Sequence, residues 1–231
     1  MPTDLHCHIL PGVDDGPRTI GEAVALALKL VAGGVERVVA TPHVNLSIPT
    51  EAATMRERLD ELRAELERHR VPLVVEPGAE VAASYLPNLD ATELAALTLG
   101  GGRWILLEPP MNADFPIEAA VASVHDAGHE VLLAHPERCR LFQRDLDRLA
   151  ALVGEGARVS VTAGSFTGHF GRQVRAVAQR LVKADLVHNA VSDAHSVIRR
   201  PPRLLADLEA AHLADRVPAW CEELPARILG D

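Results

Sequence analysis

Two histidines separated by a single residue stand at the end of the first expected β-strand, in the segment Asp4-Leu5-His6-Cys7-His8. Side chains at positions i and i+2 of a β-strand point to the same face, so His6 and His8 can converge on one point. Imidazole is the commonest side-chain ligand of metal ions, and it suits transition metals in particular. The spacing therefore indicates a metal site where the first strand leaves the core.

Further histidine and carboxylate residues follow later apolar runs, and their repetition strengthens the metal hypothesis. These residues are Asp14 and Asp15 in the loop after the first strand, and His43, Glu80, Glu108, His135, Asp193 and His195 at later strand ends. One ion uses about four to six ligands, so a set of this size predicts two or three ions that share carboxylates. A single histidine at a strand end is more often a hydrogen-bonded structural residue, and only the repetition on one rim favours ligation.

Short apolar strands alternate with helical patterns, which predicts βαβ units around a parallel sheet. Helices are expected over residues 20–31 and 51–70, and strands over 38–40, 73–75, 104–107, 131–134, 159–161 and 186–191. With the first strand included, about seven such units are expected, which is typical of an α/β barrel. The carboxyl ends of barrel strands meet at one rim, so this fold would bring the ligand residues together.

Composition limits the class of protein. A length of 231 residues favours one domain over residues 1–231, and a net charge of −9 argues against binding to nucleic acid or to an anionic membrane. No apolar run approaches about 18 residues, so no membrane span is expected. The three cysteines cannot form a disulfide framework, and the N-terminus lacks the pattern of a signal peptide. We therefore expect a cytoplasmic protein.

Several segments together resemble the polymerase-and-histidinol-phosphatase (PHP) superfamily. Beside residues 4–8, they are Gly12-Val13-Asp14-Asp15-Gly16-Pro17, Ala40-Thr41-Pro42-His43, Ala134-His135-Pro136-Glu137-Arg138 and Ser192-Asp193-Ala194-His195. The Asp-Asp-Gly-Pro loop and the His-Pro-Glu-Arg segment are similar to those of the bacterial capsule-type metal-dependent protein-tyrosine phosphatases. Residues 162–168 and Arg200-Pro201-Pro202 fit the same group. The resemblance covers nearly the whole chain.

The resemblance implies a distorted (β/α)7 barrel with a trinuclear centre of manganese, with iron or zinc as alternatives. By matching motifs, the ligands of one ion would be His6, His8, Glu108 and Asp193. A second ion would take His135 with shared carboxylates, and a third would be surrounded by Asp14, His43, Glu80 and His195. Arg138 matches the family's phosphate-binding arginine, and Arg200 matches a second basic position. The implied substrate is a phosphotyrosyl protein such as a bacterial tyrosine kinase.

The residues themselves predict a phosphatase mechanism. Neighbouring cations would activate a bridging water, and this hydroxide would attack phosphorus while Arg138 grips the non-bridging oxygens. A phenolate leaves readily, so a strong general acid is less necessary, and His195 or a metal-bound water is the candidate acid. In relatives an aromatic residue often follows the Glu-Arg pair, but this chain has Cys139 there. Aromatic content is only 3%, which leaves few rings to contact phosphotyrosine.

Four other functions are weighed against this one. A phosphatase for a small metabolite such as histidinol phosphate would use the same ligands, and a non-catalytic metal-binding regulator would be expected to lack some of them. A metal-dependent nuclease disagrees with the acidic charge. A cysteine phosphatase would need a Cys-x5-Arg loop, and only Cys221 with Arg227 has this spacing. The intervening residues are acidic and contain no glycine, so they are unsuited to a phosphate.

Overall fold

The computed structural model describes residues 1–111 and 115–230, and its named strand pairs are all parallel. The strands are β1 (Thr3–Cys7), β2 (Arg37–Ala40), β3 (His43–Val44), β4 (Val74–Glu76), β5 (Glu80–Ala82), β6 (Trp104–Glu108), β7 (Glu130–Ala134), β8 (Arg158–Thr162) and β9 (Asn189–Val191). They form one sheet in the order β1-β2-β4 and a second in the order β3-β5-β6-β7-β8-β9. The expected α/β class with parallel strands is confirmed.

The two sheets adjoin at two places. β2 leads into β3 through Thr41-Pro42, and β4 leads into β5 through residues 77–79, which begin with Pro77. Proline has no amide hydrogen to donate, so the ladder is interrupted at these points. At the other side Cys7 forms an isolated parallel bridge with Ala194, which follows β9. The sheets are therefore linked but not continuous, and a closed seven-stranded barrel stays a prediction.

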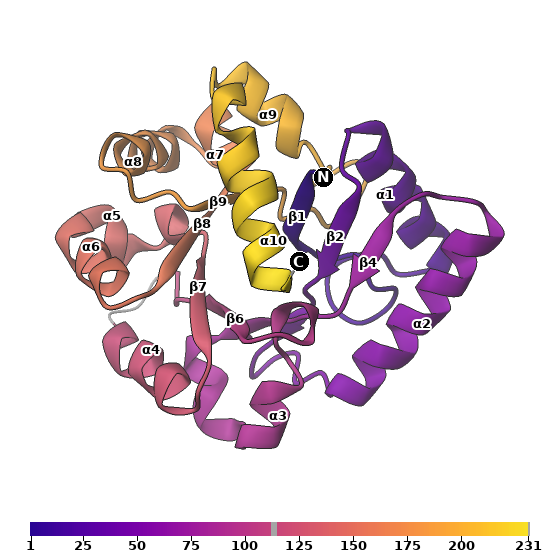
Figure 1. The fold of residues 1–231 in the computed structure, drawn as a ribbon, viewed down its shortest axis with the longest axis horizontal. Coiled ribbons are helices and arrows are strands. Elements are labelled where there is room, and N and C mark those ends of the chain that lie inside the picture. Colours follow the sequence, from indigo (N-terminus) through magenta and orange to yellow (C-terminus); the bar gives the residue numbers. More distant parts are fainter. Residues whose placement is uncertain (112–114, 231) are drawn as a thin grey trace.

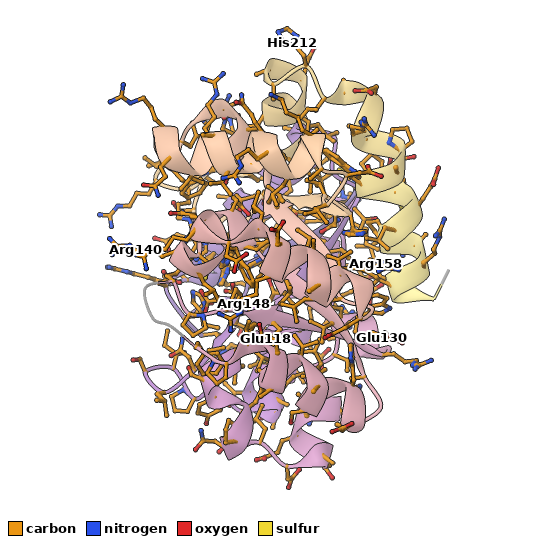
Figure 2. The ribbon with its side chains drawn as sticks, turned by 90° about the vertical axis from the view of Figure 1, so that its left-hand side faces the viewer. Glu118, Glu130, Arg140, Arg148, Arg158 and His212 are labelled. Carbon is orange, nitrogen blue, oxygen red and sulfur yellow. The ribbon has the colours of Figure 1, made fainter. Side chains whose placement is uncertain are left out.

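Helices surround the sheets and connect successive strands (Figure 1). They are α1 (Ile20–Ala32), α2 (Ala52–Arg68), α3 (Ala91–Ala95), α4 (Ile117–Asp126), α5 (Arg140–Arg144), α6 (Leu146–Gly154), α7 (Ala163–Thr167), α8 (Arg172–Lys183), α9 (Leu204–Ala210) and α10 (Leu224–Leu229). Shorter helical turns are η1 (Ala83–Asn88), η2 (Leu99–Gly101), η3 (Pro136–Arg138), η4 (Ala214–Arg216) and η5 (Pro218–Glu223). Neighbouring helices are joined by polar contacts as well, since Arg148 of α6 donates to Glu118 of α4 at 2.6 Å (Figure 2).

The apolar interior falls into two clusters. The larger cluster lies between the helices and the outer faces of the strands. The smaller one lies between the strands and contains Leu5, Val39, Leu99, Leu106, Leu132, Ala134, Val191 and Ile228. Ile228 belongs to α10, which crosses the sheets in Figure 1, and Leu224 and Leu229 of the same helix pack against this cluster. Because α10 also contacts η2, just before β6 begins, it covers the amino ends of the strands and leaves their carboxyl ends to the site.

An irregularity in β1 changes the direction of its side chains. Leu5 belongs to the inner cluster and Cys7 to the outer one, although residues two apart in a regular strand share a face. The pairing of β1 with β2 shifts register between Asp4 and Cys7. Such a bulge re-aims side chains next to a functional site. The alternation assumed from the sequence is therefore broken within the segment that carries the first histidine.

Most expected elements are present, with shifted ends. The helices expected over 20–31 and 51–70 correspond to α1 and α2, whereas the strand expected over 186–191 is formed only at Asn189–Val191. The Nδ1 atom of His188 accepts a hydrogen bond from the amide of Val159 at 3.2 Å, so a side chain replaces a backbone acceptor there. No helix in the described part of the chain is both long and apolar enough to cross a membrane.

Replacement of Leu106 by alanine should lower the free energy of unfolding by about 2–5 kcal/mol, because Leu106 is fully buried between the strands and its loss leaves a cavity. Urea denaturation followed by circular dichroism would measure the change. Leu28→Ala is the matched control, since Leu28 is 53% exposed on α1. A similar loss of unfolding free energy in the two variants would contradict the burial of Leu106 in the inner cluster.

Candidate metal centre

The histidines and carboxylates expected at strand ends meet in one cluster at the carboxyl ends of the strands. Six of them are at most 4% exposed, namely His6, His8, Glu80, His135, Asp193 and His195. His43 and Glu108 are 18% and 19% exposed at the side chain and lie at the mouth. Residues up to 189 positions apart in sequence are therefore brought to one place that is closed to bulk water on its inner side.

The two histidines of the first strand end face each other. Their Nε2 atoms are 3.1 Å apart, which confirms that they converge. Each Nε2 also lies 3.4 Å from Oε2 of Glu80 and 3.5 Å from Oδ1 of Asp193. Two imidazole nitrogens and two carboxylate oxygens thus surround one small volume, an arrangement of donors that suits a transition metal ion.

Glu80 connects this group to the rest of the cluster. Its Oε1 lies 2.7 Å from Nε2 of His135, and its Oε2 lies 2.8 Å from Nδ1 of His43. Burial would raise the pKa of Glu80, but the charge of His6 and hydrogen bonds from His135 and His43 outweigh it and hold the pKa well below its usual value. Glu80 is therefore an ionised carboxylate that several donor groups can share.

The loop after β1 assigns different positions to its two aspartates. Oδ2 of Asp14 lies 2.6 Å from Nδ1 of His8 and accepts the amide of His43 at 3.0 Å, so Asp14 is behind the imidazole. Asp15 points the other way, and its Oδ1 lies 3.2 Å from Nε2 of His195. A carboxylate on the far nitrogen of a histidine orients the ring toward a metal ion. This placement favours Asp14 as a support for His8 and Asp15 as the residue that faces the cluster.

Gly16 makes this loop possible. A Cβ at this position would collide with the backbone carbonyl of His8, and the Gly16 amide donates to Oδ1 of Asp14 at 2.9 Å. Only glycine lets the loop fold back so closely on the strand that it follows. A glycine directly after Asp14 and Asp15 is therefore required for Asp14 to reach the ring of His8.

His195 lies in the cluster as a neutral imidazole. Its Nδ1 donates to the carbonyl of Asp193 at 3.0 Å, and its Nε2 accepts from Nη1 of Arg200 at 2.9 Å. Burial and the positive charges of His8 and Arg200 lower the pKa of His195 to about 2. The one lone pair of the neutral ring, on Nε2, could ligate a metal ion in place of its contact with Arg200, but the ring has no spare proton for a leaving group. This geometry favours the ligand role over the role of general acid.

Two residues of the cluster adopt the left-handed backbone conformation. His135 has φ 34° and Asp193 has φ 52°, a region that residues other than glycine rarely occupy. Each follows a strand that ends at the cluster, β7 or β9, and each such residue costs roughly 1–3 kcal/mol. The surrounding packing holds the chain in this conformation so that both side chains turn into the cluster.

Four overlapping groups have ligand atoms within 4.8 Å of one another. They are His8-Asp15-His43-His195, His6-His8-Asp193, His6-Glu80-His135 and His43-Glu80-Glu108. The groups share members, as ligands of neighbouring ions do. Nδ1 of His6 and Nδ1 of His135 are buried without a hydrogen-bond partner among the described residues. Buried polar atoms are nearly always paired, so these two orphaned nitrogens are compatible with a bound ligand such as a metal ion. The donor set fits manganese, iron or zinc.

Two arginines meet at the carboxylate of Asp193. Arg138 donates to Oδ2 at 2.6 Å, and Nη2 of Arg200 donates to the same oxygen. Both side chains are partly exposed, whereas Asp193 is buried. The structure therefore brings Arg138 and Arg200 together at the edge of the cluster.

Glu137 is a residue whose position the sequence did not reveal. It is fully buried, and its Oε1 accepts hydrogen bonds from the amide of Thr162 at 3.1 Å and from Oγ of Ser165 at 2.7 Å. Burial raises the pKa of Glu137 to about 7. The contact ties η3, which carries Arg138, to the start of α7. The one available signal in the sequence was that Thr162 and Ser165 belong to residues 162–168, a segment that resembles the family.

The cysteines do not fit a thiol nucleophile. Cys7, Cys139 and Cys221 are all buried, and burial raises the pKa of each thiol above its usual value. A phosphatase cysteine needs the opposite, a lowered pKa in a cationic and accessible loop. The geometry of Cys221 therefore disfavours the cysteine mechanism.

Comparison with known proteins shows the family of this chain. Residues 2–215 match the family described as "Capsular polysaccharide synthesis, CpsB/CapC". The chain belongs to the CpsB/CapC family. It is 36% identical over 199 residues to the tyrosine-protein phosphatase YwqE of Bacillus subtilis, covering 85% of this chain and 78% of YwqE. It is 30% identical over 202 residues to the putative tyrosine-protein phosphatase CapC of Staphylococcus aureus, covering 86% and 78%.

Structural comparison leads to the same CpsB/CapC relatives. The fold superposes with a TM-score of 0.86 at 33% identity on a chain from the crystal structures of YwqE from Bacillus subtilis and CpsB from Streptococcus pneumoniae, described as unique metal-dependent tyrosine phosphatases. The match covers 99% of this chain and 94% of the other. A lactonase from Listeria monocytogenes has a similar fold with a TM-score of 0.58 at 11% identity, which shows the fold alone.

Metal binding should release protons, and the affinity for Mn²⁺ should increase with pH. Burial opposes a charge on His8, but the hydrogen bonds that its ring donates to Asp14, Asp193 and Glu80 raise its pKa well above the usual value. Burial and the negative charge of Glu80 raise the pKa of Glu108 to about 7. Both groups therefore carry a proton below pH 7, and a cation displaces it.

Calorimetric titration with Mn²⁺ in two buffers of different ionisation enthalpy measures the protons released. The number should be larger at pH 6 than at pH 8, where Glu108 is already ionised. His69→Gln, on the exposed end of α2, is a control that should release as many protons as the wild type. Binding without proton release at pH 6 would contradict these protonation states.

Proposed function

We propose that this chain is a metal-dependent protein-tyrosine phosphatase that hydrolyses phosphotyrosine monoesters. The observation that carries the proposal is the meeting of Arg138 and Arg200 at Asp193, on the edge of the buried imidazole–carboxylate cluster. Two guanidinium groups beside a potential multi-metal site suit a phosphate dianion. Membership of a family whose relatives are named tyrosine-protein phosphatases supports the same reaction.

We infer two or three ions, with manganese the first choice and iron or zinc as alternatives. The residues that would hold them are His6, His8, Asp15, His43, Glu80, Glu108, His135, Asp193 and His195. Asp14 would act through His8 by fixing the orientation of the ring. Glu80 belongs to two of the four groups and could serve more than one ion, whereas Glu108 would serve an ion together with His43 and Glu80.

Bound ions would act as Lewis acids on the phosphoryl oxygens and lower the pKa of a coordinated water, which provides a nucleophile at neutral pH. Arg138 and Arg200 would hold the non-bridging oxygens of the phosphate and stabilise the charge of the transition state. The buried side of the cluster excludes water, so these charge interactions are stronger than in solvent. A phenolate is a good leaving group, so the absence of a spare proton on His195 is compatible with aryl ester hydrolysis.

The substrate would be a phosphotyrosyl protein, and the capsular polysaccharide context of the family favours a bacterial tyrosine kinase. Two cavities of about 550 and 610 Å³ flank the cluster and share Arg199 and Arg200. A phosphotyrosine needs room on both sides of the phosphate site for its ring and for the peptide that carries it. The pair of cavities supports a segment of protein as the substrate.

We also propose that the two sheets are the halves of a distorted (β/α)7 barrel. β2 with β3 and β4 with β5 would each count as one interrupted strand. The bridge between Cys7 and Ala194, together with the hydrogen bond from the His8 amide to the Ala194 carbonyl at 2.9 Å, would then join the first and last strands. This arrangement would explain why ligands from the whole chain share one rim.

Removal of metal should abolish phosphatase activity, and Mn²⁺ should restore it. The test is hydrolysis of a phosphotyrosyl peptide after treatment with a chelator, after dialysis, and after addition of Mn²⁺, Fe²⁺ or Zn²⁺. Circular dichroism of the metal-free protein controls for unfolding. Full activity without metal would refute the proposal, and faster turnover of histidinol phosphate than of the peptide would favour the metabolite phosphatase.

Arg138→Ala should lower kcat/KM for a phosphotyrosyl peptide by roughly 100-fold or more, on the scale of losing a charged contact to the transition state. Arg138→Lys should recover part of this loss because lysine keeps the charge but not the forked geometry. Arg140→Ala is the matched control, since Arg140 lies two residues away and points outward (Figure 2). Wild-type kcat/KM in Arg138→Ala would refute the role of this arginine.

A further inference from the structure

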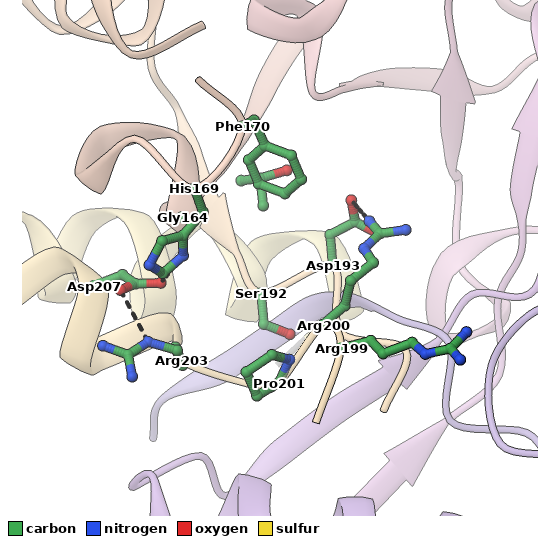
Figure 3. Close-up of a pocket in the computed structure, with 11 residues that line it drawn as sticks. Gly164, His169, Phe170, Ser192, Asp193, Arg199, Arg200, Pro201, Arg203 and Asp207 are labelled. Atoms are coloured by element: carbon green, nitrogen blue, oxygen red, sulfur yellow. Dashed lines mark hydrogen bonds and ion pairs between the residues drawn. The ribbon is translucent and has the colours of Figure 1, made fainter. Parts of the chain in front are cut away.

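The cavity of about 550 Å³ begins at the catalytic edge of the cluster (Figure 3). Asp193 and Arg200 line it where it adjoins the cluster, and Arg203, His169 and Asp207 line another part of it. The remaining lining residues include Thr162, Gly164, Phe170, Ser192, Arg199 and Pro201. The cavity therefore extends from the position expected for the phosphate toward the segment after α7.

Phe170 contributes a phenyl ring to the lining of this cavity. The ring lies beside Arg138, the residue proposed to bind the phosphate. The guanidinium carbon of Arg138 is 4.7 Å from the centre of the Phe170 ring, and the same arginine donates to Asp193. The Phe170 side chain is only partly buried, so a ligand can reach it. The aryl group of a phosphate ester held by Arg138 would thus emerge next to this ring.

Three local features hold Phe170 in place. A Cβ on Gly164 would come within 3.4 Å of Cε2 of Phe170, so the ring packs over bare backbone. Gly168 and Gly171, with φ +90° and +95°, form turns on either side of the His169-Phe170 pair. The hydrogen bond between Ser165 and Glu137 ties α7 to the element that carries Arg138. These contacts place the Phe170 ring beside Arg138.

We propose that Phe170 is a specificity-determining residue that contacts the ring of the phosphotyrosine and selects aryl over alkyl phosphate esters. The proposal rests on the proposed phosphatase function and names the aryl subsite of that same site. Pro201 lines the same cavity and offers a further apolar surface, so the substrate ring would enter between them. Relatives often have an aromatic residue at the position of Cys139, but in this chain Cys139 is buried and donates to the carbonyl of Pro110. Phe170, between α7 and α8, would provide the ring instead.

Aromatic pairs prefer offset or edge-to-face contact, and this contact adds a stabilisation that an alkyl group cannot obtain. On the scale of such pairs, the loss of the Phe170 ring should reduce binding of an aryl ligand by about two- to tenfold. Binding of an alkyl ligand of the same charge should change less. The ratio of the two affinities is the informative quantity, because any displacement of Arg138 would weaken both ligands alike.

The experiment compares phenylphosphonate with methylphosphonate, two dianions that are not hydrolysed. Calorimetry measures their affinities for the Mn²⁺-loaded wild type and for Phe170→Leu. The wild type should prefer phenylphosphonate, and Phe170→Leu should lose about two- to tenfold of this preference. Phe170→Tyr, which keeps the ring, should retain it. The matched control is Phe166→Leu on α7, whose ring is buried against Trp220 outside the cavity and whose loss should leave the preference unchanged.

An unchanged ratio in Phe170→Leu, or an equal change in Phe166→Leu, would overturn the subsite. Equal binding of the two phosphonates by the wild type would overturn it as well. Turnover of the phosphotyrosyl peptide by the wild type is measured separately. Its absence would overturn the proposed function even if phenylphosphonate were preferred, whereas turnover with an unchanged ratio would overturn only the aryl subsite.

Discussion

The structure depends on keeping a large group of ionisable side chains together out of water. Transfer of a charged group into a protein interior costs several kcal/mol, and only opposite charge and hydrogen bonds at close range offset this cost. Here Glu80 and Asp193 are almost wholly buried beside His6, His8 and His135. Their pKa values remain well below the usual range because the imidazoles surround them. A cluster with this balance of donors is suited to cations, and the rest of the molecule is arranged around that requirement.

The fold meets the requirement by local departures from regular structure. β1 shifts its register between Asp4 and Cys7, the segment that contains His6, and His135 and Asp193 turn their backbone into the left-handed region. Gly16 lets the following loop approach β1 so that Asp14 can orient His8. Regular strands and helices would direct these side chains elsewhere. The deviations occur at the carboxyl ends of the strands, while α10 and the apolar interior close the opposite end.

The substrate side of the cluster has a different chemical character from its buried side. The chain carries a net charge of −9, yet Arg138 and Arg200 lie together at the edge of the centre. A phosphate dianion would find two guanidinium groups at this edge, next to the ring of Phe170. Glu137 links the turn that carries Arg138 to the helix that precedes Phe170, so phosphate and ring recognition would be mechanically coupled.

The sequence by itself determined the parallel α/β class, the family and the set of residues that meet at the centre, because ligand types recur where apolar strands end. It could not distinguish Asp14 from Asp15, since adjacent residues in a loop point in directions that only the turn at Gly16 decides. It also missed Glu137 and Phe170, whose positions depend on contacts between segments about 30 residues apart. Local spacing records which side chains share a strand face, whereas packing between distant elements decides which of them touch the site.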